Sequence, residues 1–222
     1  MKRSQINQSI DFAIDFFKQH SFRLPPWAFL TPGEWAGKGQ AYQEIWQAGL
    51  GWDITDFGKG HFGQEGLTLF TLRNGYQGQN PFKTYCEKIM IAGQSQVTPM
   101  HFHWTKMEDI INRGGGDLCL ELWKANQEEE KTSEEFTLKI DGVVRTFRGG
   151  DVLRLKPGES ISFEPYVYHS FWAEGGPALV GEVSTVNDDS NDNRFYESLG
   201  RYPEIEEDEP ARYCLCNEYN RS

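Results

Sequence analysis

The spacing of hydrophobic residues predicts one long helix at the start of the chain. Apolar residues recur three and four positions apart from Ile6 to Phe17, and this spacing places them on one helical face. Ser4 is the predicted N-cap, and the segment from Ser21 to Pro26 ends the helix. We therefore expect an amphipathic helix that packs through one face on the rest of the molecule.

Beyond residue 60 the pattern changes to short apolar or alternating runs that are separated by glycine-rich turns. The runs are residues 67–72, 84–91, 96–103, 117–123, 136–140, 151–155, 160–163, 169–172 and 178–184. Asp141-Gly142 lies between two apolar runs, which is a strong signal for a β-hairpin. Nine or ten strands of this length predict an all-β sandwich or barrel.

Three segments outside these runs have their own predictions. Residues 24–60 are rich in Pro, Gly and Trp, and we expect a connection with one short helix around residues 42–48. The acidic run 204–209 predicts a solvated loop. Residues 213–216 alternate like a last strand.

Length and composition fit one large domain with an extension. The chain has 222 residues, of which 38% are hydrophobic and 14% aromatic, so it can bury a substantial core. We expect residues 1–60 to form a helical, aromatic-rich extension that packs on a β domain formed by residues 61–222. Four cysteines without a C-x-x-C pair predict reduced thiols.

The net charge excludes two classes of partner. Lys and Arg number 22 against 33 for Asp and Glu, so the net charge is −11. A protein this acidic is repelled by nucleic acid and by anionic membrane surfaces. The first residues contain no apolar stretch of signal-peptide length, and no run of about 18 apolar residues occurs anywhere. We therefore expect a soluble cytoplasmic protein.

Three histidines and a glutamate are the strongest candidates for metal ligands. His101 and His103 are two residues apart, so on a strand their imidazoles point to the same face. Glu108 follows five residues later and can return to this face across the next bend. His169, one of only five histidines, follows a proline-bearing turn and supplies a third imidazole. Nitrogen and oxygen donors without a thiolate suit Mn, Fe, Co, Ni or Zn.

These residues resemble the first motif of the cupin superfamily. That motif, G-x5-H-x-H-x3–4-E-x6-G, is matched by His101, His103, Glu108 and Gly115, with Ser95 in place of the opening Gly. The resemblance implies a cupin β-barrel, a jelly-roll-like all-β fold. It also implies that the two histidines and the glutamate bind one metal ion.

The second cupin motif, G-x5-P-x-G-x2-H-x3-N, is matched in part. Gly158 and His169 fall at its spacing, whereas Pro165 is displaced by one position. Tyr166 replaces the second Gly and Ala173 replaces the Asn. The resemblance implies that His169 is the fourth metal ligand.

A polar block after the run 178–184 narrows the resemblance. Glu182 begins the sequence E-V-S-T-V-N-D-D, which leads directly into a polar loop. Together with residues 85–90 and 202–210, this block is similar to the cupin-type D-lyxose isomerases. The resemblance covers most of the chain.

The resemblance to this family implies a function and a set of roles. It implies a manganese-dependent isomerase that interconverts the free sugars D-lyxose and D-xylulose, with D-mannose and D-fructose as a second pair. A proton would pass through a cis-enediol while the metal polarises the carbonyl. Glu182 and Lys88 are the candidate acid and base, and Asp189, Asp192 and Arg194 are candidates for binding sugar hydroxyls. The family also implies a homodimer.

Three other functions fit parts of the pattern. A cupin sugar-phosphate isomerase would need a cluster of cations, but basic residues near the motifs, such as Lys106, are equally expected at the surface. A metal-dependent cupin oxygenase would consume oxygen. A non-catalytic metal-dependent cupin would only bind the sugar. The sequence favours an isomerase that acts on an uncharged sugar.

Overall fold

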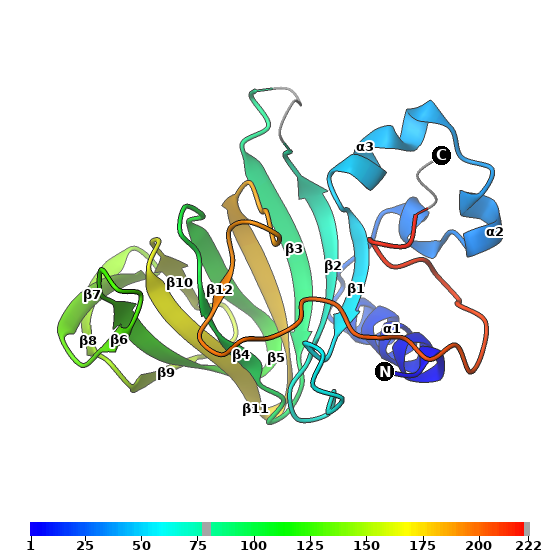
Figure 1. Ribbon diagram of the computed structural model, residues 1–222. Helices are drawn as coiled ribbons and strands as arrows, with labels where there is room; N and C mark the ends of the chain where they lie inside the picture. The colour runs from blue at the N-terminus through cyan, green and yellow to red at the C-terminus, as the bar shows by residue number, and fades with distance from the viewer. Residues whose placement is uncertain (77–80, 220–222) are drawn as a thin grey trace.

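Antiparallel strands make up most of the molecule in the computed structural model, which describes residues 1–76 and 81–219 (Figure 1). The strands are β1 (Gly51–Thr55), β2 (Leu67–Asn74), β3 (Tyr85–Ala92), β4 (Thr98–Phe102), β5 (Glu108–Ala125), β6 (Lys131–Thr132), β7 (Glu135–Ile140), β8 (Val143–Arg148), β9 (Asp151–Leu155), β10 (Ser160–Phe163), β11 (Val167–Thr185) and β12 (Arg194–Phe195). The main path of hydrogen-bonded strands is β1-β2-β3-β11-β5-β10-β7-β8. Outside this path, β4 pairs with β11 and with β12, and β9 pairs with β5. The predicted all-β architecture is confirmed.

The two longest strands connect the parts of the sheet. β5 and β11 pair with each other along nearly their whole length, and β11 also pairs with β3 and β4. The sequence predicted β5 only from residue 117 and divided β11 into two strands. Gly114, Gly115 and Gly116 had suggested a turn, but they lie where the register between β5 and β11 shifts. A Cβ atom at Gly115 would lie 2.3 Å from the Pro177 carbonyl oxygen, so only glycine allows this close approach.

The helices lie outside the sheet (Figure 1). They are α1 (Arg3–Gln19), the 3₁₀ helix η1 (Pro26–Phe29), α2 (Pro32–Trp35), the 3₁₀ helix η2 (Gln40–Tyr42) and α3 (Gln43–Gln47). The apolar face of α1, with Ile6, Ile10 and Phe17, packs on a core that includes residues of β1, β2 and β3. α3 confirms the short helix predicted around residues 42–48. None of the described helices is both long and apolar enough to cross a bilayer.

The N-cap of α1 is Lys2 and not Ser4. The Ser4 amide and hydroxyl donate hydrogen bonds to Asp208, at 2.9 and 2.7 Å. Ser4 therefore connects the helix to a segment that is 204 residues away, which a local capping rule does not anticipate. The same contact shows that the acidic run 204–209 lies along α1 and is not simply a solvated loop.

Two further segments differ from the predictions. β1 was not predicted, because its residues follow a Pro- and Gly-rich region. β1 lies within residues 1–60, the expected extension, yet it pairs with β2 of the expected β domain. The division of the chain into an extension and a β domain at residue 60 stays a prediction. Residues 213–216 form only an isolated bridge between Leu215 and Trp52, and the predicted last strand is wrong. A turn in which the Glu218 amide donates to the Leu215 carbonyl ends the pairing there.

Candidate active site

Strand pairing brings the four predicted metal ligands together. His169 of β11 pairs directly with His101 of β4, while His103 follows β4 and Glu108 begins β5. All four side chains are buried, and one ligand atom from each lies within 4.8 Å of the others. The arrangement could therefore hold one metal ion.

Backbone carbonyls orient all three imidazoles. Nδ1 of His101 donates to the Pro99 carbonyl at 2.7 Å, and Nδ1 of His169 donates to the Val167 carbonyl at 3.1 Å. Nδ1 of His103 donates to the carbonyl of Asp192. Because Nδ1 carries the proton in each ring, Nε2 keeps its lone pair for a cation.

The carboxylate of Glu108 completes a set of donors that fits a metal ion. Its Oε1 atom lies 3.1 Å from Nε2 of His169 and 3.5 Å from Nε2 of His103. This oxygen is buried and has no hydrogen-bond donor in the described part of the chain. Lone pairs that face each other at such distances repel unless a cation lies between them, so these residues fit a metal ion.

The protonation states also suit metal binding. Burial lowers the pKa of His101 well below its ordinary value and lowers the pKa of His103 to about 4. Burial opposes ionisation of Glu108, but Lys106, His103 and His169 together outweigh it and hold the pKa of the carboxyl well below its usual range. At neutral pH His101 and His103 are therefore neutral and Glu108 is ionised, which are the forms that bind metals.

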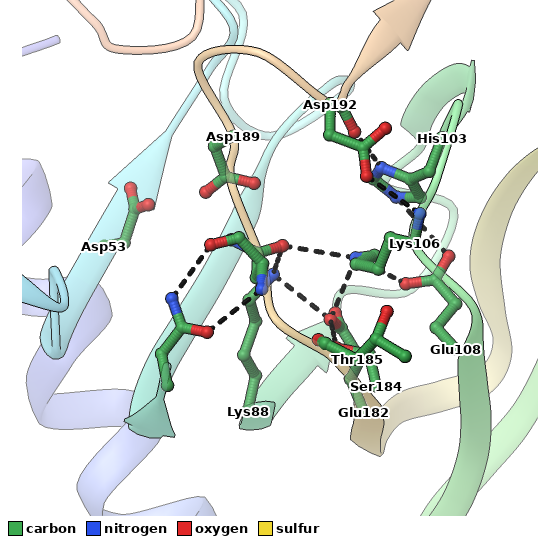
Figure 2. Close-up of polar contacts among 12 residues, drawn as sticks. Asp53, Lys88, His103, Lys106, Glu108, Glu182, Ser184, Thr185, Asp189 and Asp192 are labelled. Atoms are coloured by element: carbon green, nitrogen blue, oxygen red, sulfur yellow. Dashed lines mark hydrogen bonds and ion pairs between the residues drawn. The ribbon is translucent and has the colours of Figure 1, made fainter. Parts of the chain in front are cut away.

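Glu182 lies in the same cavity and is held by two lysines (Figure 2). It pairs across the sheet with Lys88 of β3, and only 4% of Glu182 is exposed. Its Oε1 atom accepts from Lys106 at 3.0 Å and from the Ser184 hydroxyl at 3.2 Å, and it lies 3.2 Å from the Lys88 ammonium. Within the described residues, all hydrogen bonds and ion pairs of this carboxylate go to Oε1, which leaves Oε2 free.

The charges of this group are stable at neutral pH. Burial opposes ionisation of Glu182, but Lys106 and then Lys88 outweigh it and lower the pKa of the carboxyl. Burial also opposes the positive charge of Lys88, but Glu182 keeps the pKa of this lysine above its ordinary value. Glu182 can therefore accept a proton, and the lysines can donate hydrogen bonds.

Lys106 is not a surface residue, contrary to the sequence-based expectation. It is buried, and its ammonium lies 2.7 Å from Oε2 of Glu108, so it connects the metal-ligand cluster to Glu182. No local pattern indicates its burial, because Lys106 lies in the irregular segment between β4 and β5. The same ammonium donates to the Asn187 side chain at 3.2 Å.

The loop after β11 contributes Asp189 to the cavity. Its carboxylate accepts from Arg201 at 2.8 Å, and the same guanidinium nitrogen donates to Asp53 of β1. Burial opposes ionisation of Asp189, but Arg201, Lys88 and Lys106 together outweigh it and hold the pKa of the carboxyl well below its usual range. Neither Arg201 nor Asp53 was a candidate from the sequence, because both lie in segments without a recognisable motif.

Asp192 and Arg194 lie outside the cavity lining within the described residues. The Asp192 carboxylate accepts from the amide and hydroxyl of Thr105 at 2.8 and 2.7 Å and from the Lys106 amide at 2.8 Å. Arg194 donates to Glu129 at 3.0 Å. Both side chains are therefore engaged in holding loops around the site.

The cavity is lined on its remaining sides by apolar residues and by polar atoms without partners. The apolar lining includes Phe57, Leu67, Leu69, Met90, Ile110, Phe171 and Phe195. Besides Glu108 Oε1, three buried polar atoms of lining residues lack a hydrogen-bond partner within the described chain: Thr98 Oγ1, Asn193 Oδ1 and an Arg201 guanidinium nitrogen. Unpaired buried polar atoms are costly, so their concentration in one cavity suits a polar ligand.

The fold places the protein in the cupin class and is shared with L-ribose isomerases. The L-ribose isomerase of Cellulomonas parahominis matches with a TM-score of 0.59 and 15% identity, over 92% of this chain and 98% of that one. The enzyme of Acinetobacter sp. DL28 matches with a TM-score of 0.58 and 14% identity over the same shares. At such low identity the likeness concerns the fold, and the predicted cupin β-barrel is confirmed.

The chain belongs to the D-lyxose isomerase family, whose model matches residues 1–219. The D-lyxose/D-mannose isomerase of Escherichia coli O157:H7 is 52% identical to it, over 100% of this chain and 99% of that protein. The enzyme of the same name from Serratia proteamaculans is 51% identical over the same shares. The resemblance inferred from the sequence is confirmed, and the protein is a sugar isomerase that interconverts an aldose and a ketose.

Proposed function

We propose that this isomerase interconverts D-lyxose with D-xylulose and D-mannose with D-fructose by proton transfer through a cis-enediol at a divalent metal site. The observation that carries the proposal is one cavity that joins a His-His-Glu-His cluster to Glu182, a buried carboxylate with a free oxygen. The names of the two relatives that are 52% and 51% identical support these substrates. We further infer that the protein is cytoplasmic. We also infer that it works as a homodimer, and gel filtration would test this oligomeric state.

The proposed metal ligands are Nε2 of His101, His103 and His169 and the carboxylate of Glu108. The metal, which we propose to be Mn²⁺, would act as a Lewis acid on the sugar carbonyl and on the adjacent hydroxyl. The protein contributes imidazoles that are fixed by backbone carbonyls and a carboxylate that Lys106 helps to keep ionised. These features would favour binding of a divalent ion.

Glu182 is the proposed base. Its Oε2 atom removes the proton from C2 of the aldose and returns it to C1, while O1 gains a proton and O2 loses one, so that the carbonyl moves from C1 to C2. Lys88 would donate the proton to O1 and take up the proton from O2. Lys88 is the proposed acid, and its ammonium stabilises negative charge on the sugar oxygens as the enediol forms. Ser184 and Lys106 bind Oε1, so the carboxylate is fixed in one orientation before the sugar arrives.

The sequence predicted three loop residues as ligands of the sugar hydroxyls. Of these three, we propose that Asp189 binds the hydroxyls directly. It lines the cavity and can accept hydrogen bonds from hydroxyls while Arg201 holds it. For Asp192 and Arg194 we propose the indirect role of holding the loop, because their side chains are already paired.

The charges of the site favour an uncharged sugar over a sugar phosphate. Lys88, Lys106 and Arg201 are the cations of the cavity, and each is paired with at least one carboxylate. A phosphate would need a cation without such a partner. The proposal therefore takes free sugars as the substrates.

The direct test is to incubate the protein, reconstituted with Mn²⁺, with a panel of free aldoses and to measure ketose formation. We expect D-xylulose from D-lyxose and D-fructose from D-mannose, with no product from aldose phosphates. The double variant His101→Ala, His103→Ala should lose bound metal and activity together. Full metal occupancy in this variant would contradict the ligand assignment, and activity in the metal-stripped parent would contradict metal dependence.

A further inference from the structure

Asn187 makes contacts that none of the roles above uses. Its side-chain oxygen Oδ1 accepts from the Lys88 ammonium at 2.8 Å and from the Lys106 ammonium at 3.2 Å. Both ammonium groups also contact Oε1 of Glu182, so two acceptors share the same two donors. The facing ammoniums identify the oxygen of this amide, because its NH₂ group would be repelled there.

The backbone of Asn187 is held by a second asparagine. The Asn187 amide donates to Oδ1 of Asn74 at 3.0 Å, and Nδ2 of Asn74 donates to the Asn187 carbonyl at 2.9 Å. Asn74 is buried at the end of β2, and its Nδ2 atom also donates to the Ala48 carbonyl at 3.3 Å. The Asn74 side chain therefore pairs with the Asn187 backbone as a neighbouring strand would, and it fixes this residue of the loop after β11.

We propose that Asn187, held by Asn74, is a positioning residue that keeps both lysines on Oε1 of Glu182 and so leaves Oε2 free for the proton of the substrate. The inference rests on the proposed role of Glu182 as the base. Without a second acceptor, either ammonium can swing to Oε2 and block the atom that must take the proton.

The neutrality of Asn187 is part of this role. Lys88 and Lys106 are balanced by Glu108 and Glu182, and an amide adds an acceptor without adding charge. A carboxylate in the same place would compete with Glu182 for both ammonium groups. Asn187→Asp has nearly the same size, so it tests the charge of this acceptor separately from its shape.

The experiment measures kcat and KM for D-lyxose, bound metal and thermal stability in Asn187→Ala, Asn187→Asp and Asn74→Ala. A displacement of a catalytic group by about 1 Å costs about 10²-fold in rate, so we expect kcat to fall about 10- to 100-fold in both Asn187 variants. KM, metal content and Tm should stay close to those of the parent. Asn191→Ala is the matched control, because Asn191 lies in the same loop and, among residues 1–76 and 81–219, its side chain hydrogen-bonds only to Asp188.

A double variant tests whether Asn74 acts through Asn187. If it does, Asn74→Ala should cost little more in kcat when Asn187→Ala is already present. Additive losses would contradict this, and a parental kcat in Asn187→Ala would overturn the inference. An equal loss in Asn191→Ala, or a loss that follows metal content or Tm, would also overturn it. Glu182→Gln separates the two proposals: if that variant keeps its turnover, the proposed base is wrong regardless of Asn187.

Discussion

The proposed chemistry of this site depends on single side chains, and Glu182 is the most direct case. Gln at this position keeps the size of the side chain and an oxygen that can accept from Lys106, but it cannot take up a proton. We expect Glu182→Gln to lose about two or more orders of magnitude in kcat, the scale of general acid–base catalysis. The variant should still fold and bind metal, although the loss of a charge that balances two buried lysines lowers its stability. If the variant loses its metal instead, Glu182 is a metal ligand and not the base.

The buried histidines make the stability of the metal-free protein dependent on pH. Burial lowers the pKa of His103 to about 4, whereas in the unfolded chain it is about 6.5. Between these values the unfolded state binds a proton that the folded state does not, so the free energy of unfolding falls as the pH decreases through this window. A shift of this size corresponds to about 3 kcal/mol for this residue.

Urea denaturation in the presence of a chelator, at pH values from 7.5 to 4.5, measures this loss. His103→Gln removes the titrating group, so its free energy of unfolding should depend less on pH over the same range. Equal slopes in the parent and in this variant would show that His103 is protonated as readily in the folded protein as in the unfolded chain.

The clustering of the four candidate metal ligands could be predicted from the sequence because alternation along a strand is a local rule. His101 and His103 share a face for this reason, and the spacing to Glu108 and His169 follows known motifs. Lys106 could not be predicted as a buried residue, since its environment is formed by β11 and by the loop after it. Residues that act through distant neighbours leave no local pattern.

The backbone conformation of two turns shows why the cupin motifs have glycine at two positions where this chain has another residue. Ser95 and Tyr166 stand where the motifs have glycine, and both have a left-handed backbone, with φ of 58° and 61°. For a residue other than glycine this conformation costs about 1–2 kcal/mol. Tyr166 stacks on Phe102 with ring centroids 5.1 Å apart, which offsets part of that cost, whereas the Ser95 side chain is exposed.

We therefore expect Ser95→Gly to stabilise the protein. Relief of the left-handed strain exceeds the added entropy of glycine in the unfolded chain, which leaves a gain of about 0.5 to 1 kcal/mol. Tyr166→Gly should gain less or lose stability, because it also removes the stacking. Urea denaturation at neutral pH measures both changes, and a destabilised Ser95→Gly would contradict the assignment of strain.

The same long-range contacts limit what the sequence can predict about the whole molecule. The strand runs and the first helix follow from periodicity, but β1 and the path of the C-terminal segment depend on packing between the two ends of the chain. Residues 204–209 look like a solvated acidic loop in the sequence. In the structure, Glu207 and Asp208 bind Arg3 and Ser4 of α1.

Arg3 is the main anchor of this contact between the two ends. It is 3% exposed and donates to Glu207 at 2.6 Å and to Glu218 at 2.5 Å. Because hydrogen bonds between charged groups are worth about 1.5–3 kcal/mol, we expect Arg3→Ala to lower the free energy of unfolding by about 2 kcal/mol. The C-terminal segment should also become more sensitive to limited proteolysis.

Arg212→Ala provides the control for Arg3→Ala. Arg212 pairs with Asp11 of the same helix, but both side chains are largely exposed, so its loss should cost at most about 1 kcal/mol. If Arg3→Ala and Arg212→Ala are equally stable, the buried Arg3 contributes no more to the free energy of unfolding than an exposed ion pair does.

The reaction that we propose moves a proton through Glu182 and not a hydride within the sugar. The most direct measurement is the fate of deuterium placed at C2 of D-lyxose, followed by mass spectrometry and NMR during many reversible turnovers in ordinary water. A carboxylate that takes up the proton exchanges it with solvent, so we predict progressive loss of the label from both D-xylulose and recovered D-lyxose. Complete retention of the label, transferred to C1 of D-xylulose, would contradict the account.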